Sequence, residues 1–323
     1  MDRRLALMAL GTLPLGAAAQ AQPGAFPGRP VRIVSAFSPG SGPDAMLRLV
    51  GERLSKAWGQ PVTIDNRPGG GGFIAVAEVK KVPADGHTLL HADGLNFTAV
   101  PHLYKKLPYQ VSDFDPVTPI HRSFFFIAVA ANSPHRTLAD LIAAAKARPN
   151  EVTYGSWQVG SVAHLSGAML EAATGTRMNH IPFRDNAQLY GAVASGDVAW
   201  AFGSAGSTGP LQRAGKLRYL ALAGPRRLDT HPDVPTVTEA GGPPQFEASG
   251  WVGLFAPRGT DRAVEDRLSA DLAKALNDPA VRSKMTEFGY EPLPLSPADT
   301  AALVARESPR YAEIVKRDAI VLD

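Results

Sequence analysis

Two short segments combine the residue types that bind small anions. The first, residues 38–42, reads Ser-Pro-Gly-Ser-Gly and comes just before a periodic apolar stretch. The second, residues 156–161, contains glycine and two serines and precedes another such stretch. A loop from a strand to a helix N-terminus offers unpaired N–H groups and the positive end of the helix dipole, and glycine lets the backbone approach a ligand. Together the segments predict a two-sided clamp for a small carboxylate.

Four side chains near the second segment extend this chemistry. Trp157 can stack on a flat ligand, and Arg184 can bind a distal carboxylate through two parallel hydrogen bonds. Asp185 would then pair with Arg184 or meet a ligand amine or hydroxyl, whereas a solvated Arg-Asp turn is an equal alternative. His164 can donate to a ligand oxygen or tie down its own loop, and we favour the second role.

The candidate site follows from these two segments and their neighbours. Each loop alone is also typical of a plain strand–helix turn. We predict that Asp44 is the N-cap of the first helix, because an acid in the site would repel a carboxylate. We assign no catalytic residue, metal ligand or cofactor. The candidate ligand-binding residues are Phe37, Ser38, Pro39, Gly40, Ser41, Gly42, Ser156, Trp157, Gln158, Val159, Gly160, Ser161, His164, Arg184, Asp185 and Ser204.

The composition excludes several classes of function. The chain has 323 residues, of which 45% are hydrophobic and 20% charged, and it has no cysteine. The absence of cysteine excludes thiol catalysis, cysteine-ligated zinc, iron–sulfur clusters and disulfides. The formal net charge is +3, and the basic residues are scattered rather than clustered, which argues against nucleic-acid binding. The length is sufficient for about two domains.

The N-terminus has the layout of a secretory signal peptide. Arg3 and Arg4 precede a mostly apolar stretch, and small residues follow, ending in Ala19-Gln20-Ala21. This order of basic, apolar and cleavage regions predicts that residues 1–21 are removed after Ala21, with an uncut anchor as the alternative. The apolar stretch is short for a membrane span, and no later run of about 18 apolar residues exists.

Strands, glycine-rich loops and helices alternate along the rest of the chain. This alternation predicts an α/β fold with a mainly parallel sheet. The tract at residues 69–72 lacks the ending of a P-loop, so we interpret it as a packing turn. The expected strands are 31–37, 62–64, 88–92, 124–130, 152–156, 180–183, 198–202, 217–222 and 251–256, and the expected helices are 44–58, 74–81, 138–148, 162–174, 187–194 and a broken section from 263.

An ordered set of motifs carries a resemblance to a known family. The motifs include Asn66-Arg67-Pro68 with the glycines after it, residues 85–90 (Asp-Gly-His-Thr-Leu-Leu), residues 233–236 (Asp-Val-Pro-Thr) and residues 251–260. In this order they resemble the tripartite tricarboxylate transporter substrate-binding (TctC-like) family, the Bug-type extracytoplasmic solute receptors. At His87 the family usually has tyrosine.

The resemblance implies an α/β, two-lobe periplasmic-binding-protein-like (type II) fold. Each lobe would be a mainly parallel sheet flanked by helices, with two crossing strands as a hinge. Lobe one would span 22–122 plus 252–323 and lobe two 123–251, with crossings in 124–130 and 251–256. The two loops would hold ligand carboxyl groups in the cleft, partly through water.

The same resemblance implies a periplasmic receptor that is not an enzyme. It would bind a small organic acid and dock transiently on membrane transporter subunits, as a monomer and without nucleic acid. A ligand-sensing partner of a membrane kinase would share the same clamp. A hydrolase built on Ser161 and His164 is the enzymatic alternative, but the chain has no G-x-S-x-G elbow and no H-E-x-x-H motif.

Overall fold

The computed structural model describes residues 26–322. The predicted signal peptide lies outside these residues. Within them, no helix is long and apolar enough to cross a membrane. In chain order the elements are β1 (Val31–Ser35), α1 (Gly42–Trp58), β2 (Val62–Asn66), a 3-10 turn (Gly70–Gly72), α2 (Phe73–Val79), β3 (Thr88–Asp93), α3 (Leu95–Thr98), α4 (Val100–Leu103), a second 3-10 turn (Val111–Asp113), β4 (Phe114–Ala130), α5 (Leu138–Ala147), β5 (Thr153–Ser156), α6 (Val162–Thr174), β6 (Asn179–Pro182), α7 (Asn186–Ser195), β7 (Trp200–Gly203), α8 (Ala205–Arg213), β8 (Leu217–Ala223), β9 (Ser249–Pro257), α9 (Arg262–Leu276), α10 (Pro279–Phe288), β10 (Tyr290–Pro292) and α11 (Pro297–Arg317).

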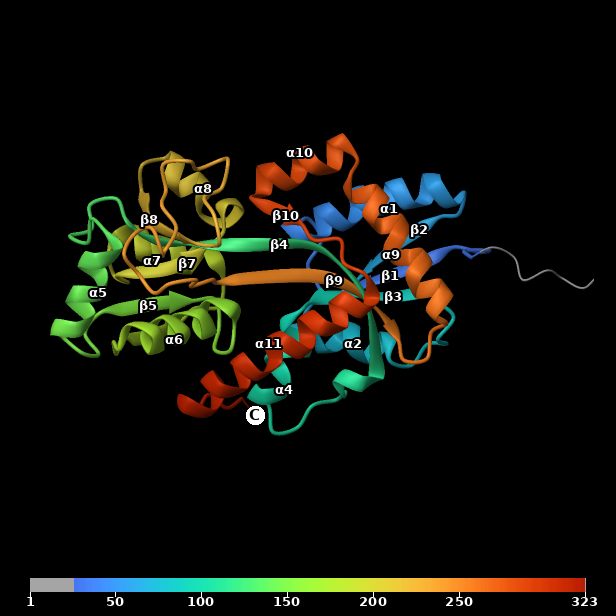
Figure 1. Ribbon diagram of the computed structural model, residues 1–323, viewed down its shortest axis with the longest axis horizontal. Coiled ribbons are helices and arrows are strands. Elements are labelled where there is room, and N and C mark those ends of the chain that lie inside the picture. The colour runs from blue at the N-terminus through green and yellow to red at the C-terminus, as the bar shows by residue number, and fades with distance from the viewer. Residues whose placement is uncertain (1–25, 323) are drawn as a thin grey trace, which may run out of the picture.

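The strands form a mixed sheet that extends through both halves of the molecule. Its order is β2-β1-β3-β9-β4-β7-β5-β6, and β8 and β10 also pair with β4. In the first half β1 lies parallel to β2 and β3, and in the second half β5 lies parallel to β6 and β7. β9 runs antiparallel to both β3 and β4. This arrangement, with helices around each half (Figure 1), confirms the expected two-lobe α/β architecture.

Two long strands connect the halves. β4 has 17 residues and pairs with β9 in the first half and with β7 and β8 in the second. It begins at Phe114, ten residues before the expected crossing strand. Pro116 and Pro119 cannot donate to a sheet, and register shifts in the β4–β9 pairing accommodate both. The proposed lobe boundaries stay a prediction.

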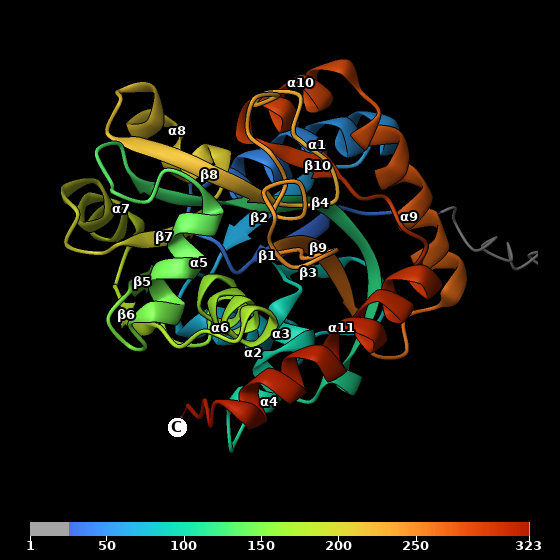
Figure 2. The same cartoon turned by 60° about the vertical axis from the view of Figure 1, so that its left-hand side comes forward.

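Each half has its own apolar core, and the C-terminal helix contacts both. Trp200, Tyr154 and Phe202 are fully buried in the second half, as Ile33 and Leu47 are in the first. The 21-residue helix α11 packs against β4 and α3 and also reaches α6. Figure 2 shows α11 running along one side of the molecule below these elements. The crossing strands are therefore not the sole link between the halves.

A buried carboxyl in α9 makes stability depend on pH. Glu265 is 5% exposed, and burial, together with the nearby charge of Asp115, raises its pKa to about 7. The folded state then holds a proton that the unfolded chain loses near the ordinary value of 4.5. Stability should therefore fall as pH rises from about 4.5 through 7.

We expect Glu265→Gln to remove this dependence. Above pH 7 the variant should be more stable than the wild type by about 1–2 kcal/mol, and below pH 5 the two should converge. Urea denaturation at pH 5, 6, 7 and 8 measures the difference. Asp266→Asn, whose side chain is 56% exposed, serves as the control and should not change the pH profile. An equal effect of Glu265→Gln at every pH would contradict the expected titration.

Candidate functional site

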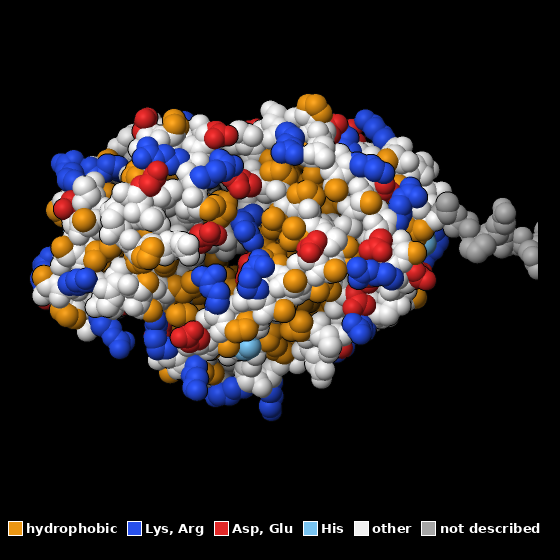
Figure 3. All heavy atoms as spheres, viewed as in Figure 1, with side chains coloured by type: hydrophobic (Ala, Val, Ile, Leu, Met, Phe, Trp, Pro, Cys, Tyr) orange, Lys and Arg blue, Asp and Glu red, His pale blue; other side chains and the backbone are white. Residues whose placement is uncertain are grey.

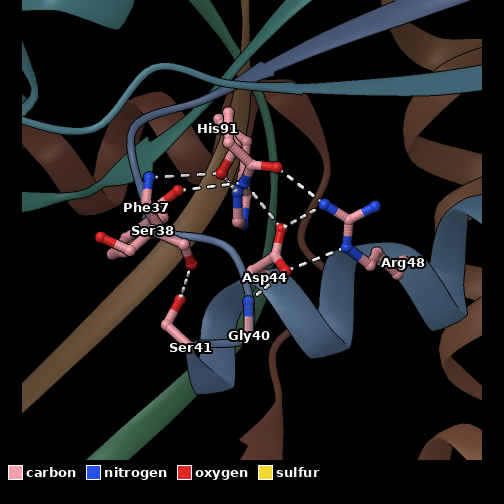
Figure 4. A network of polar contacts seen from close by, with 9 residues as sticks. Phe37, Ser38, Gly40, Ser41, Asp44, Arg48 and His91 are labelled. Atoms are coloured by element: carbon pink, nitrogen blue, oxygen red, sulfur yellow. Dashed lines mark hydrogen bonds and ion pairs between the residues drawn. The ribbon is translucent and has the colours of Figure 1, made fainter.

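The first predicted loop connects β1 to α1. The helix begins at Gly42, its N-cap is Ser41 in an extended conformation, and Pro43 occupies its first turn. The prediction that Asp44 is the N-cap was wrong, since the helix starts two residues earlier. Proline is well tolerated in the first turn because its missing N–H has no partner there anyway. Asp44 instead lies inside the first turn and points back to the loop (Figure 4).

Asp44 holds this loop through a buried network. Its carboxylate accepts from the Gly40 N–H (2.8 Å), from Arg48 Nε (2.9 Å) and from Asn66 Nδ2 (2.7 Å). Asn66 also donates to the Phe37 carbonyl oxygen (3.0 Å). Burial alone would raise the pKa of Asp44, but these hydrogen bonds outweigh it and hold the pKa below its ordinary value. The carboxylate is therefore ionised at neutral pH and fixes both ends of the loop.

The second predicted loop connects β5 to α6. The Ser161 side chain accepts from the His164 N–H (3.4 Å), so Ser161 is the N-cap of α6. The Gly160 N–H donates to His164 Nδ1 (3.0 Å). Burial lowers the pKa of His164 to about 4, so its ring is neutral and accepts this bond. The favoured role of His164, tying down its own loop, is confirmed.

Gln158 carries backbone strain within this loop. Its φ of 153° lies in the region that favours glycine. Such conformations cost about 1–3 kcal/mol and persist where the surroundings enforce them, often at functional sites. The Ser156 hydroxyl donates to the Gln158 carbonyl oxygen (2.8 Å) and helps to hold it. The strain indicates that the backbone conformation of the loop between Ser156 and Ser161 is enforced by its surroundings.

A cavity of about 210 Å³ lies between the two loops. Phe37 and Pro43 line it from the first half, and Trp157, Ser161 and Val162 line it from the second. In the described part of the chain, the N–H groups of Val162 and its neighbour Ala163 donate to no protein acceptor. The positive end of the α6 dipole and the unpaired N–H groups of its first turn therefore lie at the cavity.

The predicted residues separate into three groups. Phe37, Trp157, Gln158, Val159, Gly160 and Ser161 line the cavity. The loop residues Ser38, Pro39, Gly40, Ser41 and Gly42 lie beside Phe37 and Pro43 without lining it. The other five predicted residues lie outside the cavity. Ser156 is buried and forms a hydrogen bond with His180 (2.7 Å), His164 is also buried, and Arg184 is exposed. Asp185 caps α7, and Ser204 caps α8.

Sequence reasoning missed six polar residues that line the cavity. They are Asp93, Asn96, Tyr104, His121, Ser123 and Tyr290. Asp93 ends β3, and ligands of α/β proteins bind beyond the carboxyl ends of parallel strands, so its position was the one available signal. Asn96 and Tyr104 come from the short helices α3 and α4 that follow β3. His121, Ser123 and Tyr290 are brought together by the pairing of β4 with β10, which sequence periodicity does not reveal. The glycine tract was interpreted as a packing turn, yet Gly71 also lines the cavity.

A larger groove of about 860 Å³ lies elsewhere and has a different character. Five arginines and three glutamates line it, and neither predicted loop contributes. Several of these charges pair with one another, as Arg227 does with Glu239 (2.8 Å). Figure 3 shows basic and acidic side chains intermixed over one face of the molecule. In residues 26–322 no cluster of three or more histidine or acidic side chains could hold a metal ion.

Gly160 offers a test of the loop's shape. Its φ is +78°, and a Cβ there would lie 2.9 Å from Leu103 Cδ1 at the cavity wall. We expect Gly160→Ala to weaken ligand binding about tenfold, because either the loop or the Leu103 side chain at the cavity wall must shift. Gly175→Ala is the matched control, since Gly175 also has a positive φ (+64°) but open space around it.

Both alanine variants should lose roughly 1 kcal/mol of stability, because both place a side chain in a left-handed conformation, and Gly160→Ala should lose somewhat more because its Cβ meets Leu103 and Leu322. Isothermal titration calorimetry measures affinity, and urea denaturation measures stability. Equal affinities in the two variants would contradict a role for Gly160 in the site.

The chain is similar to a family of receptors and to solved members of it. Residues 46–320 match the family described as the tripartite tricarboxylate transporter family receptor. Protein BugT of Bordetella pertussis is 32% identical over 318 residues, covering 98% of this chain and 97% of BugT. The structure of R. palustris Rpa4515 with adipate is 34% identical with a TM-score of 0.78, covering 90% of this chain and 97% of that one.

A second solved structure extends this likeness. MatC (Rpa3494) from Rhodopseudomonas palustris with bound malate is 29% identical with a TM-score of 0.75, covering 90% of this chain and 100% of that one. The agreement over nearly the whole length confirms the periplasmic-binding-protein-like fold.

Proposed function

The chain belongs to the tripartite tricarboxylate transporter receptor family, and from this premise we propose that it captures a small organic carboxylate between its lobes and delivers it to a membrane transporter. Two solved relatives hold adipate and malate, both small carboxylates. We further propose that the chain works in the periplasm after removal of residues 1–21.

One observation carries the proposal: two loops that are about 120 residues apart in sequence line one small cavity. Phe37 and Pro43 approach it from one half, and Trp157 and Ser161 approach it from the other. The unpaired N–H groups at the start of α6 can donate hydrogen bonds to a ligand carboxylate, so that no lysine or arginine side chain is needed for this contact. A carboxylate bound there contacts both halves at once, so it can stabilise their approach.

The crossing strands β4 and β9 are the proposed hinge. A ligand that bridges the halves shifts the population toward the closed form by its differential affinity for the two states. The contact of α11 with α6 must adjust in the same motion, because Arg317 on α11 donates to the Ala168 carbonyl oxygen (2.7 Å). Closure therefore changes three connections between the halves together: β4, β9 and the contact of α11 with α6.

The geometry gives little support to catalysis. The Ser161 hydroxyl is occupied as a helix cap and His164 Nδ1 accepts from backbone, so these two side chains do not form a nucleophile–base pair. Ser156 does contact His180 Nε2, but burial lowers the pKa of His180 to about 3 and its ring stacks on His164 rather than meeting a carboxylate. We therefore propose a receptor rather than a hydrolase.

A thermal-shift screen of the mature protein against di- and tricarboxylates, aromatic acids and amino acids tests this function. A true ligand should raise the melting temperature saturably, since at 100 times Kd it stabilises the folded state by about 2.7 kcal/mol. Small-angle scattering should then show compaction with the same compound.

Two outcomes would overturn the proposal. One is the absence of any shift, combined with no acid in mass spectra of the denatured protein. The other is turnover of a bound compound by the purified protein. Binding without compaction would reject the hinge motion and leave carboxylate capture intact.

A further inference from the structure

The groove of about 860 Å³ carries an excess of positive charge, and we call it the arginine groove. Three glutamates also line it, which leaves two positive charges in excess. Figure 3 shows basic and acidic side chains near the middle of the face that α11 crosses. The volume lies within the roughly 300–1,000 Å³ of small-molecule sites. The arginines that line the groove are Arg122, Arg226, Arg227, Arg306 and Arg310.

The arginine groove is separate from the cavity between the two loops. His121 and Ser123 of β4 line that cavity, whereas Arg122 between them lines the groove. Successive side chains of a strand point to opposite faces of the sheet, so the two spaces lie on opposite sides of β4. Ser249 of β9 and Ser166 of α6 also line the groove, which is therefore bordered by both halves of the molecule.

Three of the arginines face a single carboxylate, that of Glu307. The charges of Arg122, Arg306 and Arg310 all act on Glu307. Arg122 Nη2 lies 3.6 Å from Glu307 Oε1, which is too long for a hydrogen bond, and Oε2 accepts from Trp251 Nε1 (2.8 Å). Arg306 and Arg310 lie one turn apart on α11, and in the described part of the chain they form no hydrogen bond and no ion pair. Like charges at this spacing repel each other, so one carboxylate leaves guanidinium groups unmatched.

Arg122 also holds a buried donor without an acceptor. Within residues 26–322 its Nε is buried and has no hydrogen-bond partner. A buried donor without a partner costs free energy that an incoming acceptor can recover. The hydroxyl groups of Ser166 and Ser249 add further donors to the same groove.

The unmatched charge is concentrated on the side of α11 and β4. On the other side of the groove, Arg226 already pairs with Glu291 (2.8 Å) and Arg227 with Glu239 (2.8 Å). These two arginines therefore contribute less to the positive potential than Arg306 and Arg310 do.

We propose that the arginine groove is a second ligand site and that it binds a compact oligoanion, a molecule with several phosphate or carboxylate groups. Guanidinium groups bind both kinds of anion through two parallel hydrogen bonds, and the basic residues of the groove are all arginines. Several anionic groups are needed because Arg122, Arg306 and Arg310 are separate donors around one carboxylate. The site goes beyond the proposed function and does not depend on what the cavity between the two loops binds.

Calorimetry at pH 7.5 and low salt, without divalent cations, tests the proposal. The probes are tripolyphosphate and benzenehexacarboxylate, with orthophosphate as the single anion. We expect at least one oligoanion to bind about tenfold or more tightly than orthophosphate, because it engages several arginines at once. Tighter binding of tripolyphosphate would assign phosphorylated compounds to the groove, and tighter binding of benzenehexacarboxylate would assign polycarboxylic acids.

Two variants with opposite effects locate the binding. The double variant Arg306→Gln/Arg310→Gln changes two exposed side chains and should weaken the better oligoanion about tenfold or more. Glu247→Gln removes a negative charge from the groove wall and should tighten binding about threefold. A gain of affinity cannot arise from poor folding.

The matched control is Arg136→Gln/Arg148→Gln, which removes the same two charges from exposed positions outside the groove and the cavity. It should bind the oligoanion as the wild type does. The proposal is overturned if neither oligoanion binds, if orthophosphate binds as tightly, or if both double variants lose affinity equally. A fall in oligoanion affinity in Gly160→Ala would place the probe in the cavity between the two loops and would also overturn it.

Discussion

Replacing Phe255 with alanine is expected to lower the free energy of unfolding by about 3–5 kcal/mol. Phe255 lies in crossing strand β9, is 1% exposed and stacks on Phe97 with ring centroids 3.8 Å apart. Phe97 in turn meets Phe114 at the start of β4 (5.8 Å). Removing the ring leaves a cavity where three segments of the chain meet, and close-packed cores collapse only partly around such gaps.

Urea denaturation followed by circular dichroism measures this loss. Phe255→Leu is the matched control and should cost clearly less, because it keeps most of the apolar volume. Since β9 and β4 run through both halves, we expect one cooperative transition in every variant. Ligand affinity of the folded protein should not change, as Phe255 does not line the cavity. A loss below 1 kcal/mol would contradict the packing role, and two separate transitions would contradict the cooperative coupling of the halves.

The same region shows what sequence patterns reveal about the fold. The β-branched residues Val31, Ile33 and Val34 identify a buried strand. The left-handed Gly59 at the end of α1 marks the helix end at the expected place. The start of β4 escaped this reasoning, because two prolines are unfavourable in a regular strand. Bulges that depend on the partner strand β9 resolve the conflict, and a partner more than 130 residues away leaves no local signal.

The site divides in the same way. Loops and helix caps are local, so Ser161 and its neighbours could be assigned from serine and glycine spacing. The wall of the cavity is built by cross-strand rows, in which Asp93 and His121 become neighbours only through the register of β9. Arg184 had the right chemistry for a carboxylate, but the fold leaves it exposed and away from the cavity. Its role in binding stays a prediction.

Asp44→Ala is expected to cost about 2–3 kcal/mol of stability and to weaken ligand binding at least tenfold. Asp44 is 1% exposed and accepts from Gly40, Arg48 and Asn66. Hydrogen bonds to a charged group contribute about 1.5–3 kcal/mol, and buried donors left without a partner add a desolvation cost. The affinity should fall because the loop that carries Phe37 into the cavity wall loses its anchor. Denaturation and calorimetry measure the two effects.

The pH dependence separates this anchor from simple packing. The pKa of Asp44 lies below its ordinary value of 3.8, so its contribution is present above that value and is lost as pH falls through the folded pKa. The difference between wild type and Asp44→Ala should therefore stay constant from pH 5 to 8 and shrink below pH 4. Asp44→Asn keeps one acceptor and should lie between them, whereas Glu52→Ala, two turns along α1, should alter neither binding nor this profile. A difference that persists unchanged at pH 3 would mean that Asp44 acts through its volume, and the loop anchor would then have to be sought in Asn66, which bonds to Phe37 independently of charge.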